Sequence, residues 1–324
     1  MNTSPNLKLK DIRLAQDKIQ SYIRFTPLEF SHTLSKQTDS RIYFKLENWQ
    51  KTGSFKIRGA LNKLFSLSPD EKQKGVITAS AGNHGLGVAF AAKLLSVQGK
   101  IVVPVNVSPA KLKALQQYNL EIIQKGVDYD EAEEYAWELQ QLEGLTFIHA
   151  FSDPEIIVGQ GTIGLEILEK LPDVETVVVP IGGGGLISGI AVAVKNLNPK
   201  VKVMGVQPEA SPAMYNSIKA GKVVETPIED TIADGLAGRF VTELTLSLTK
   251  KYVDNLILVS EDAIKIAVNL ILESEHLLIE GAAAVGVAAL LENKIRSSNK
   301  TVIVLTGRNV DIDLIKSLLG NKLK

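Results

Sequence analysis

Lys56 lies in the stretch Lys51 to Ala60, which reads Lys-Thr-Gly-Ser-Phe-Lys-Ile-Arg-Gly-Ala, and its side chain could do covalent chemistry. A lysine amine forms Schiff bases with carbonyl compounds when burial or nearby cations keep it neutral. Most lysines near the start of a helix are solvated surface charges, so Lys56 alone indicates no activity. A covalent role would require a phosphate cradle and groups that hold an aromatic ring elsewhere in the chain.

A glycine-rich stretch, Pro-Ile-Gly-Gly-Gly-Gly-Leu-Ile-Ser-Gly from Pro180 to Gly189, supplies a candidate cradle. It follows an apolar run and precedes a predicted helix, where bare backbone N–H groups can surround an anion. No Gly-Lys-Ser/Thr follows, so it is not a Walker A loop. Gln207 stands where a dinucleotide-binding protein would carry an acidic residue for the ribose. The stretch indicates a phosphate site, with close helix–strand packing as the competing interpretation; its four consecutive glycines are Gly182, Gly183, Gly184 and Gly185.

A second loop, Thr78 to Gly87, also follows an apolar run. The side chains of Ser80, Asn83 and His84 offer donors there, and Gly82 exposes backbone N–H at a helix start. This loop could hold a carboxylate or a phenolic oxygen. Ordinary helix capping by Ser80 or Asn83, with a half-buried His84, is the simpler alternative.

Two further candidates lie near the carboxyl end of the chain. Thr306 ends the apolar run that begins at Val302 and is followed by Gly-Arg-Asn-Val-Asp311. Glu280 is a lone carboxylate in an apolar stretch, which requires a partner or a task unless it caps the helix that starts at Gly281. Ligands gather beyond the carboxyl ends of parallel strands, so Thr306 and the two glycine loops are expected to converge.

Composition excludes several functions. The chain has 324 residues and no cysteine, which excludes disulfides, thiolate zinc sites and cysteine nucleophiles. The four histidines lack HExxH spacing, so we expect no metal site. Basic and acidic residues number 36 each, so no global charge recruits nucleic acid. A small-molecule substrate is the better expectation.

The elements that must position these residues alternate between short β-rich runs and helical segments, which is typical of parallel α/β structure. We expect a helix over 9 to 24 and strands over 41 to 47, 76 to 78, 101 to 105, 121 to 124, 146 to 149, 176 to 181, 202 to 206, 256 to 260 and 301 to 306. No Pro-, Gly- or Ser-rich linker divides the chain, so its lobes must be interwoven. The first ten residues lack the apolar core of a signal peptide, and Pro180 with the glycines makes the run 176 to 194 unsuitable as a membrane span. We therefore expect a cytoplasmic protein.

With these pieces assembled, the chain resembles the fold-type II pyridoxal-phosphate enzymes of the threonine dehydratase and serine racemase group, most closely the short catabolic threonine (serine) dehydratases. The motifs Ser54 to Gly59, Ser80 to His84, Gly182 to Gly185 and Thr306 to Asp311 occur in the order of that family and at similar separations.

The resemblance implies a role for each candidate. Lys56 would hold the cofactor, pyridoxal 5'-phosphate, and remove the α-proton of an amino acid. Phe55 would pack on the cofactor ring and Asn83 would bond its phenolic oxygen, while the four glycines bind the phosphate. The loop formed by Ser80, Ala81, Gly82, Asn83 and His84 would take the substrate carboxylate. Thr306 would face the pyridine nitrogen.

The resemblance also implies a tryptophan-synthase-β-like fold with the cofactor in a cleft between two lobes, each a mostly parallel sheet flanked by helices. The smaller lobe would span about 51–150 and the larger about 1–50 plus 151–324. We expect a single catalytic unit with no carboxyl-terminal regulatory domain, no isoleucine inhibition, and a homodimer by analogy.

The expected reaction is dehydrative deamination of L-threonine or L-serine. A neutral hydroxyl at Thr306 does not enforce protonation of the pyridine nitrogen, which favours prompt loss of a β-hydroxyl over a long-lived carbanion. Racemases of this group carry a second serine where this chain has Ala81, so we expect little racemisation.

Other departures concern metal binding and substrate choice. Gln207 and Ala213 stand where some relatives place acidic ligands, so we expect no activation by magnesium. Arg308 stands where relatives often have glycine; it could pair with Asp311, or act on the cofactor or select an acidic substrate. The chain does not rank threonine against serine.

Several alternatives stay open. Within the same family they are a hydroxyaspartate dehydratase, a serine racemase or a β-replacement enzyme. From other classes they are an NAD-dependent dehydrogenase, which lacks its ribose carboxylate here, and a non-catalytic sensor, which would not need Lys56.

Overall fold

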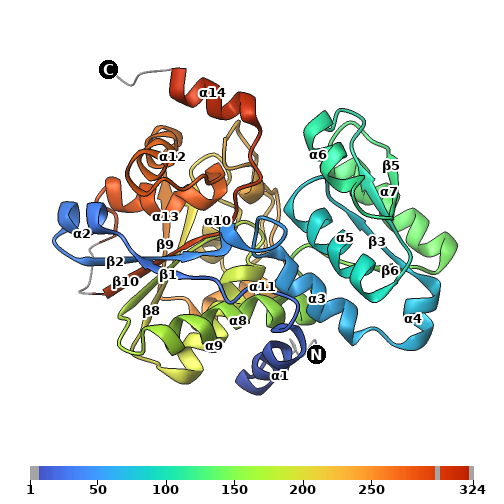
Figure 1. Ribbon diagram of the computed structural model, residues 1–324, viewed down its shortest axis with the longest axis horizontal. Helices are drawn as coiled ribbons and strands as arrows, with labels where there is room; N and C mark the ends of the chain where they lie inside the picture. The colour runs from blue at the N-terminus through green and yellow to red at the C-terminus, as the bar shows by residue number, and fades with distance from the viewer. Residues whose placement is uncertain (1–6, 296–299, 321–324) are drawn as a thin grey trace.

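The computed structural model describes residues 7–295 and 300–320, which form two β-sheets surrounded by helices (Figure 1). The strands are β1 (Leu28–Phe30), β2 (Arg41–Leu46), β3 (Val76–Ala79), β4 (Gly99–Val103), β5 (Glu121–Gln124), β6 (Thr146–Phe147), β7 (Thr176–Pro180), β8 (Lys202–Pro208), β9 (Asn255–Val259) and β10 (Lys300–Leu305). The helices are α1 (Leu9–Ile19), α2 (His32–Thr38), α3 (Lys56–Ser66), α4 (Pro69–Lys74), α5 (Asn83–Leu95), α6 (Pro109–Leu115), α7 (Tyr129–Glu143), α8 (Pro154–Lys170), α9 (Gly185–Leu197), α10 (Ala213–Ala220), α11 (Glu243–Tyr252), α12 (Glu261–Glu275), α13 (Gly281–Leu291) and α14 (Ile312–Gly320). Two short 3₁₀ segments are η1 (Glu47–Trp49) and η2 (Asp234–Leu236).

Six strands form the large sheet, in the order β1-β2-β10-β7-β8-β9. All neighbours are parallel except β1 and β2, which pair antiparallel at one edge. The last strand in sequence, β10, lies in the interior of the sheet, where Ile303 pairs with Phe44 of β2 and Val178 of β7. Thr306 therefore follows a central strand, at the edge where ligands gather in parallel sheets.

Helices bury both faces of the large sheet, which explains why central strands such as β7 and β10 are largely apolar. On β7, Val178 packs in a cluster with α12 and α13, whereas Val177 and Val179 pack in a cluster with α9. On β10, Ile303 likewise faces the first cluster, and Val302 faces the second. Successive side chains point to opposite faces of a strand, so both sides demand apolar residues.

Four parallel strands form the small sheet, in the order β5-β4-β3-β6, and all of them lie between residues 76 and 147. Helix α7 packs against one face through Ala132 and Ala136, while α5 packs against the other through Val88 and Ala89. In Figure 1 the small sheet and its helices lie on one side of the molecule and the large sheet on the other, with α3 between them. The division into lobes stays a prediction.

Most expected elements are confirmed, with two differences. The expected helix over 9 to 24 is wrong beyond Ile19, because the side-chain amide of Gln50 takes the backbone N–H and C=O of Arg24 in hydrogen bonds of 2.9 and 2.8 Å. The sequence analysis also missed β1, whose three residues are too short to show a pattern. The helix starts at Ser68-Pro69 and Ser108-Pro109 are capped as their sequences indicate.

Within the described residues, no helix combines the length and apolar character needed to cross a bilayer. The expectation of a cytoplasmic protein depends partly on the first ten residues, and residues 1–6 of these lie outside the described ranges.

Candidate active site

Lys56 is the first residue of α3, the helix that lies between the two sheets in Figure 1. Its amine donates to the carbonyl oxygen of Ala150, which follows β6, at 3.0 Å. Burial lowers the pKa of Lys56 to about 8, although the negative charge of Glu280 opposes this shift. A lysine with such a pKa has a substantial neutral fraction near pH 7, which is what a nucleophilic or basic amine requires.

Thr306 lies directly after β10 and next to the segment that carries Lys56. Its carbonyl accepts from the N–H of Phe55 at 3.1 Å, and a single antiparallel bridge joins Ser54 to Gly307. Within residues 7–295 and 300–320 its hydroxyl is buried and has no hydrogen-bond partner. An unsatisfied buried hydroxyl is costly, so this one is available to a ligand.

The glycine loop connects β7 to α9 and packs too tightly for any side chain. A Cβ on Gly183 would come within 2.5 Å of the Phe151 ring, and one on Gly185 within 2.7 Å of the Phe151 carbonyl oxygen. Gly184 has a φ of +93°, a conformation that favours glycine. The loop is therefore closely packed, as the competing interpretation expects. Because its glycines carry no side chains, the loop also leaves bare backbone at the amino end of α9, a thirteen-residue helix.

Asn83, the first residue of α5, is held by two partners from the far end of the chain. Its Nδ2 donates to Glu280 Oε1 at 2.8 Å, and its Oδ1 accepts from Asn309 Nδ2 at 2.6 Å. Asn309 also donates its backbone N–H to Glu280 Oε2 at 3.2 Å. These three residues form a closed polar set that joins α5 to the segments around α13 and β10.

Glu280 precedes α13 but, among the described residues, makes no capping hydrogen bond to that helix. Its carboxylate instead accepts from Asn83 and lies against Gly307. A Cβ added to Gly307 would come within 2.5 Å of Glu280 Oε1. Burial raises the pKa of Glu280 to about 7, and the hydrogen bond from Asn83 opposes the shift. The capping alternative is thus wrong, and Glu280 is a carboxyl poised between its two protonation states near neutrality.

The loop from Ser80 to His84 can offer backbone N–H groups to a ligand, but not the imidazole ring of His84. His84 is buried, its Nε2 lies 2.9 Å from the Ile148 carbonyl oxygen, and burial lowers its pKa to about 3. The imidazole is therefore neutral and faces the interior, as the half-buried alternative expects. Ser80 Oγ accepts from the N–H of Gly82 at 3.2 Å, and a Cβ on Gly82 would meet no atom within 4 Å. Space is thus left beside Gly82.

Arg308 is exposed, and among the described residues it makes no ion pair with Asp311. Its backbone N–H donates to the Gly53 carbonyl at 2.9 Å. Gln207 is buried, and its amide holds the start of α10 by accepting from the Tyr215 N–H at 2.8 Å and donating to the Ser211 carbonyl at 3.3 Å. Ala213 is buried at the first position of that helix. The expectations about magnesium and about Arg308 stay predictions.

Sequence reasoning missed three groups in this region. Asn309 lies inside the motif Thr306 to Asp311 but received no role, although its amide is the link between Asn83 and Glu280. The Phe151 ring packs directly under the glycine loop. His149, whose pKa burial lowers to about 4, accepts from the N–H groups of Phe151 and Ser152 at 3.2 and 2.9 Å. Phe151 and Ser152 follow His149 by two and three residues, and this short spacing is the sequence signal for the turn.

Comparison with protein families gives a match over residues 19–307, to the model described as "Pyridoxal-phosphate dependent enzyme". The chain belongs to this family. The resemblance to fold-type II pyridoxal-phosphate enzymes is thereby confirmed, as is the α/β fold with two sheets.

Relatives within the family are similar over nearly the whole chain. An L-threonine ammonia-lyase of Thermotoga maritima is 45% identical over 317 residues, covering 98% of this chain and 79% of that protein. The catabolic L-threonine dehydratase TdcB of Escherichia coli is 40% identical over 315 residues, covering 96% of both. Among solved structures, maize serine racemase superposes with a TM-score of 0.92 at 35% identity, covering 98% of both chains.

The residues present fit pyridoxal phosphate. The bare backbone of Gly182 to Gly185 at the start of α9 fits its phosphate, and the orphaned hydroxyl of Thr306 fits its ring nitrogen. The amine of Lys56, with its lowered pKa, fits its aldehyde. In the described structure Asn83 is engaged by Glu280 and Asn309, so a bond to the phenolic oxygen would share or exchange these contacts.

Proposed function

We propose that this enzyme catalyses the dehydrative deamination of L-threonine and L-serine, which gives 2-oxobutyrate or pyruvate and ammonia. The observation that carries the proposal is the Lys56 amine, with a pKa of about 8, whose neighbour Phe55 bonds to Thr306 and whose acceptor Ala150 precedes the Phe151 ring that packs on the glycine loop. The relatives named as threonine ammonia-lyase and threonine dehydratase, at 45% and 40% identity, support the choice of substrate.

When bound, pyridoxal phosphate withdraws electrons from the α-carbon of an amino acid. The backbone N–H groups of the glycine loop and the amino end of α9 bind the phosphate. Thr306 Oγ would donate to the ring nitrogen, which would satisfy the hydroxyl that has no partner among the described residues. A hydroxyl leaves this nitrogen without a full proton, so the ring withdraws electrons less strongly than it would beside a carboxylate.

Lys56 moves the proton. Its neutral amine takes the α-proton of the substrate, and the carbonyl of Ala150, 3.0 Å away, orients the amine and accepts from it. The β-hydroxyl leaves together with one proton as water, and the resulting enamine takes up one water to give the 2-oxo acid and ammonia. The weak electron withdrawal favours this elimination over a long-lived carbanion.

The substrate carboxylate binds at the loop from Ser80 to His84. The amino end of α5 and the open space at Gly82 support this placement. Ala81 presents a methyl group, which cannot deliver a proton to the α-carbon. Lys56 is then the proton-transfer residue at that atom, so racemisation is slow relative to elimination.

The test is a substrate panel on purified protein loaded with pyridoxal phosphate, measuring 2-oxo acid, ammonia and the chirality of the remaining amino acid. L-Threonine and L-serine should release 2-oxo acid, and borohydride should fix the cofactor on the peptide that contains Lys56. Lys56→Ala should abolish turnover. Lys51→Ala is the matched control, because Lys51 is exposed in the same segment and should retain turnover.

A protein that gains no absorbance when given pyridoxal phosphate would contradict the proposal. Interconversion of L- and D-serine at a rate comparable to ammonia release would contradict the preference for elimination. Preferential turnover of 3-hydroxyaspartate would instead assign Arg308 a role in selecting an acidic substrate.

We further propose a cytoplasmic homo-oligomer, with a dimer as the expected state by analogy with the family. Light scattering of the purified holoenzyme and fractionation of cells that produce the chain test these two expectations.

A further inference from the structure

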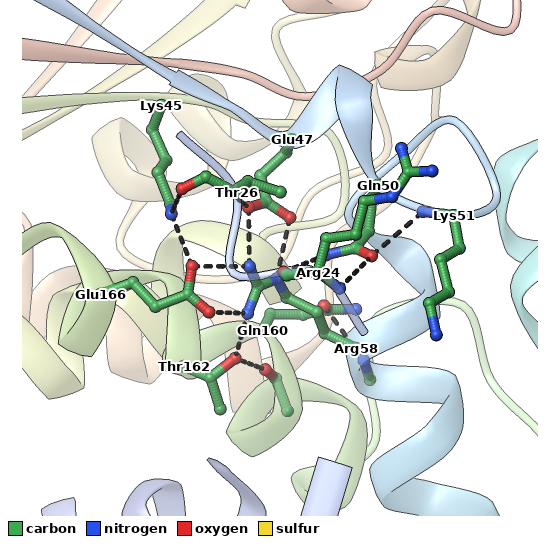
Figure 2. A network of polar contacts seen from close by, with 12 residues as sticks. Arg24, Thr26, Lys45, Glu47, Gln50, Lys51, Arg58, Gln160, Thr162 and Glu166 are labelled. Carbon is green, nitrogen blue, oxygen red and sulfur yellow. Dashed lines mark hydrogen bonds and ion pairs between the residues drawn. The ribbon is translucent and has the colours of Figure 1, made fainter. Parts of the chain in front are cut away.

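Four buried charged residues from β2, η1, α3 and α8 meet in ion pairs; we call them the buried charge cluster (Figure 2). They share almost complete burial, with at most 3% of each side chain exposed, and are Lys45, Glu47, Arg58 and Glu166. Two carry positive and two negative charge, so the cluster is balanced. Such clusters are costly to build from isolated charges and persist only with good geometry.

Arg58 is the centre of the cluster. It donates to Glu47 through Nε and Nη2, both at 2.8 Å, and to Glu166 through Nη1 at 2.6 Å and Nη2 at 2.9 Å. Nη1 also donates to Thr162 Oγ1 at 3.0 Å. These contacts use all five N–H donors of the guanidinium. A planar fork fixed at five points can adopt few other orientations.

The remaining polar atoms are also satisfied. Lys45 donates to Glu166 at 2.5 Å and to the Thr26 carbonyl at 2.7 Å, and Thr26 Oγ1 donates to Glu47 at 2.5 Å. Burial lowers the pKa of Lys45, whereas for Glu47 burial is outweighed by the adjacent Arg58 charge, which keeps the pKa below its usual range. Figure 2 shows that the partners come from β2, η1 and α8, which ties the first turn of α3 to the elements of the large sheet.

Close backbone contact reinforces this tie. A Cβ on Gly59 would come within 2.8 Å of the Ile156 carbonyl oxygen, and one on Gly159 within 2.7 Å of the Arg58 carbonyl oxygen. The side chain of Gln160 accepts from the Gly59 N–H at 3.2 Å. Helices α3 and α8 therefore cross at direct backbone contact, immediately beside the guanidinium.

The direction of Lys56 depends on this anchorage. Residues two apart on a helix point about 200° apart, so Arg58 faces the cluster while Lys56 faces the site. A rotation of α3 by about 10° would move an amine held at the end of a lysine side chain by on the order of 1 Å. Displacements of that size can cost roughly 100-fold in rate.

We propose that Arg58 is a positioning residue, whose five donor contacts, four with the cluster and one with Thr162, set the rotation of α3 and so aim the Lys56 amine at the reacting atoms. The inference rests on the proposed role of Lys56. It makes the cluster part of the catalytic geometry, in addition to any contribution to stability.

The main test is Arg58→Lys in the holoenzyme, because lysine keeps the charge balance but loses the fork. We expect the variant to fold, with kcat for L-threonine at least roughly 10-fold lower, and with KM and the affinity for pyridoxal phosphate within about 3-fold of wild type. A kcat within 2-fold of wild type would overturn the inference. Lys63→Met is the matched control, since Lys63 lies on the same helix and pairs with Asp153 at the start of α8 at 2.7 Å; its kcat should not change.

A second pair of variants separates positioning from stability. Arg58→Met leaves the cluster with excess negative charge and should lower the melting temperature. Adding Glu166→Gln restores the charge balance and should recover much of the melting temperature without recovering kcat. If kcat recovers together with the melting temperature, Arg58 serves stability only and the inference is wrong.

A third readout does not depend on turnover. Covalent uptake of pyridoxal phosphate at Lys56, trapped with borohydride, should be at least roughly 10-fold slower in Arg58→Lys. Normal uptake in this variant would overturn the inference. Wild-type protein that takes up the cofactor at Lys56 but releases no 2-oxo acid would contradict the proposed reaction alone.

Discussion

Asn83 and Glu280 are joined by a hydrogen bond of 2.8 Å although 197 positions separate them in the sequence. The bond connects the first residue of α5 with the residue before α13, so it links a helix of the small sheet to a helix of the large sheet. Because burial raises the pKa of Glu280 to about 7, the charge at this junction changes near neutral pH.

Glu280→Gln should therefore change how stability depends on pH. The pKa of Glu280 is about 7 in the folded protein and about 4.5 in an unfolded chain, so the folded state holds a proton across this interval. The resulting stabilisation is complete below pH 4.5 and is lost as the pH rises through 7. Relative to wild type, the free energy of unfolding of the variant should gain about 3 kcal/mol between pH 4.5 and 7.5. Denaturant titrations of wild type and variant at both pH values measure this difference. If the free energy of unfolding changes equally with pH in the two proteins, the raised pKa of Glu280 is contradicted.

Lys56 should take up pyridoxal phosphate with an unusual pH dependence. Because burial lowers its pKa to about 8, the neutral amine is fully available above that pH. In cofactor-free protein, the rate of covalent uptake should rise up to about pH 8 to 9 and then level off. Stopped-flow absorbance measures the rate. A rate that keeps rising to pH 10.5, as for a solvated lysine, would show that the amine is not desolvated.

Gly184→Ala should weaken cofactor binding at least 10-fold. The substitution forces a side chain into a φ of +93°, with its Cβ within 3.0 Å of Thr245 Cβ, at the start of α9 where the phosphate would bind. Gly221→Ala is the matched control, because Gly221 has a φ of +75° but a Cβ there would meet no atom within 4 Å. The control should lose about 1 kcal/mol of stability and keep its affinity. Fluorescence titration with pyridoxal phosphate compares the two, and equal affinities would place the phosphate elsewhere.

Thr306→Val should have opposite effects on stability and on binding. Replacing a buried hydroxyl that has no partner among the described residues should stabilise cofactor-free protein by about 1 kcal/mol. The same change removes the donor to the ring nitrogen and should lower the affinity for pyridoxal phosphate. Thr249→Val is the control, since Thr249 Oγ1 in α11 is likewise buried without a partner in the described ranges but lies on a different element. Loss of affinity in both variants would argue against the role of Thr306.

The parts of the structure that were predictable are those specified by local pattern. Apolar runs located the strands because helices bury both faces of each sheet, and consecutive glycines located the loop because no side chain fits there. Glu280 was identified as a candidate from its apolar surroundings alone. Its partner Asn83 could not be deduced, since hydrogen bonds between distant residues depend on how the two sheets come together.

The buried charge cluster could not be predicted from the sequence for the same reason. Lys45 and Glu47 belong to a short strand and a 3₁₀ turn, and Glu166 to a helix, and nothing in these local patterns distinguishes the three from exposed surface residues. Their burial depends on elements distant in sequence, because Arg58 of α3 and Glu166 of α8 meet Lys45 and Glu47 there. The early end of α1 has a similar cause, because Gln50 captures the backbone of Arg24 from outside the helix.

The place of β10 in the large sheet sets the order in which the protein can assemble during synthesis. Its partners β2 and β7 emerge from the ribosome long before it does, and they do not pair with each other in the finished sheet. The small sheet, confined to residues 76–147, has all its strands as soon as that segment is free. The nascent chain therefore carries two unjoined portions of the large sheet until residue 305 has been translated. Thr306 directly follows β10, so a cofactor site that includes its hydroxyl cannot be completed before residue 306 has been added.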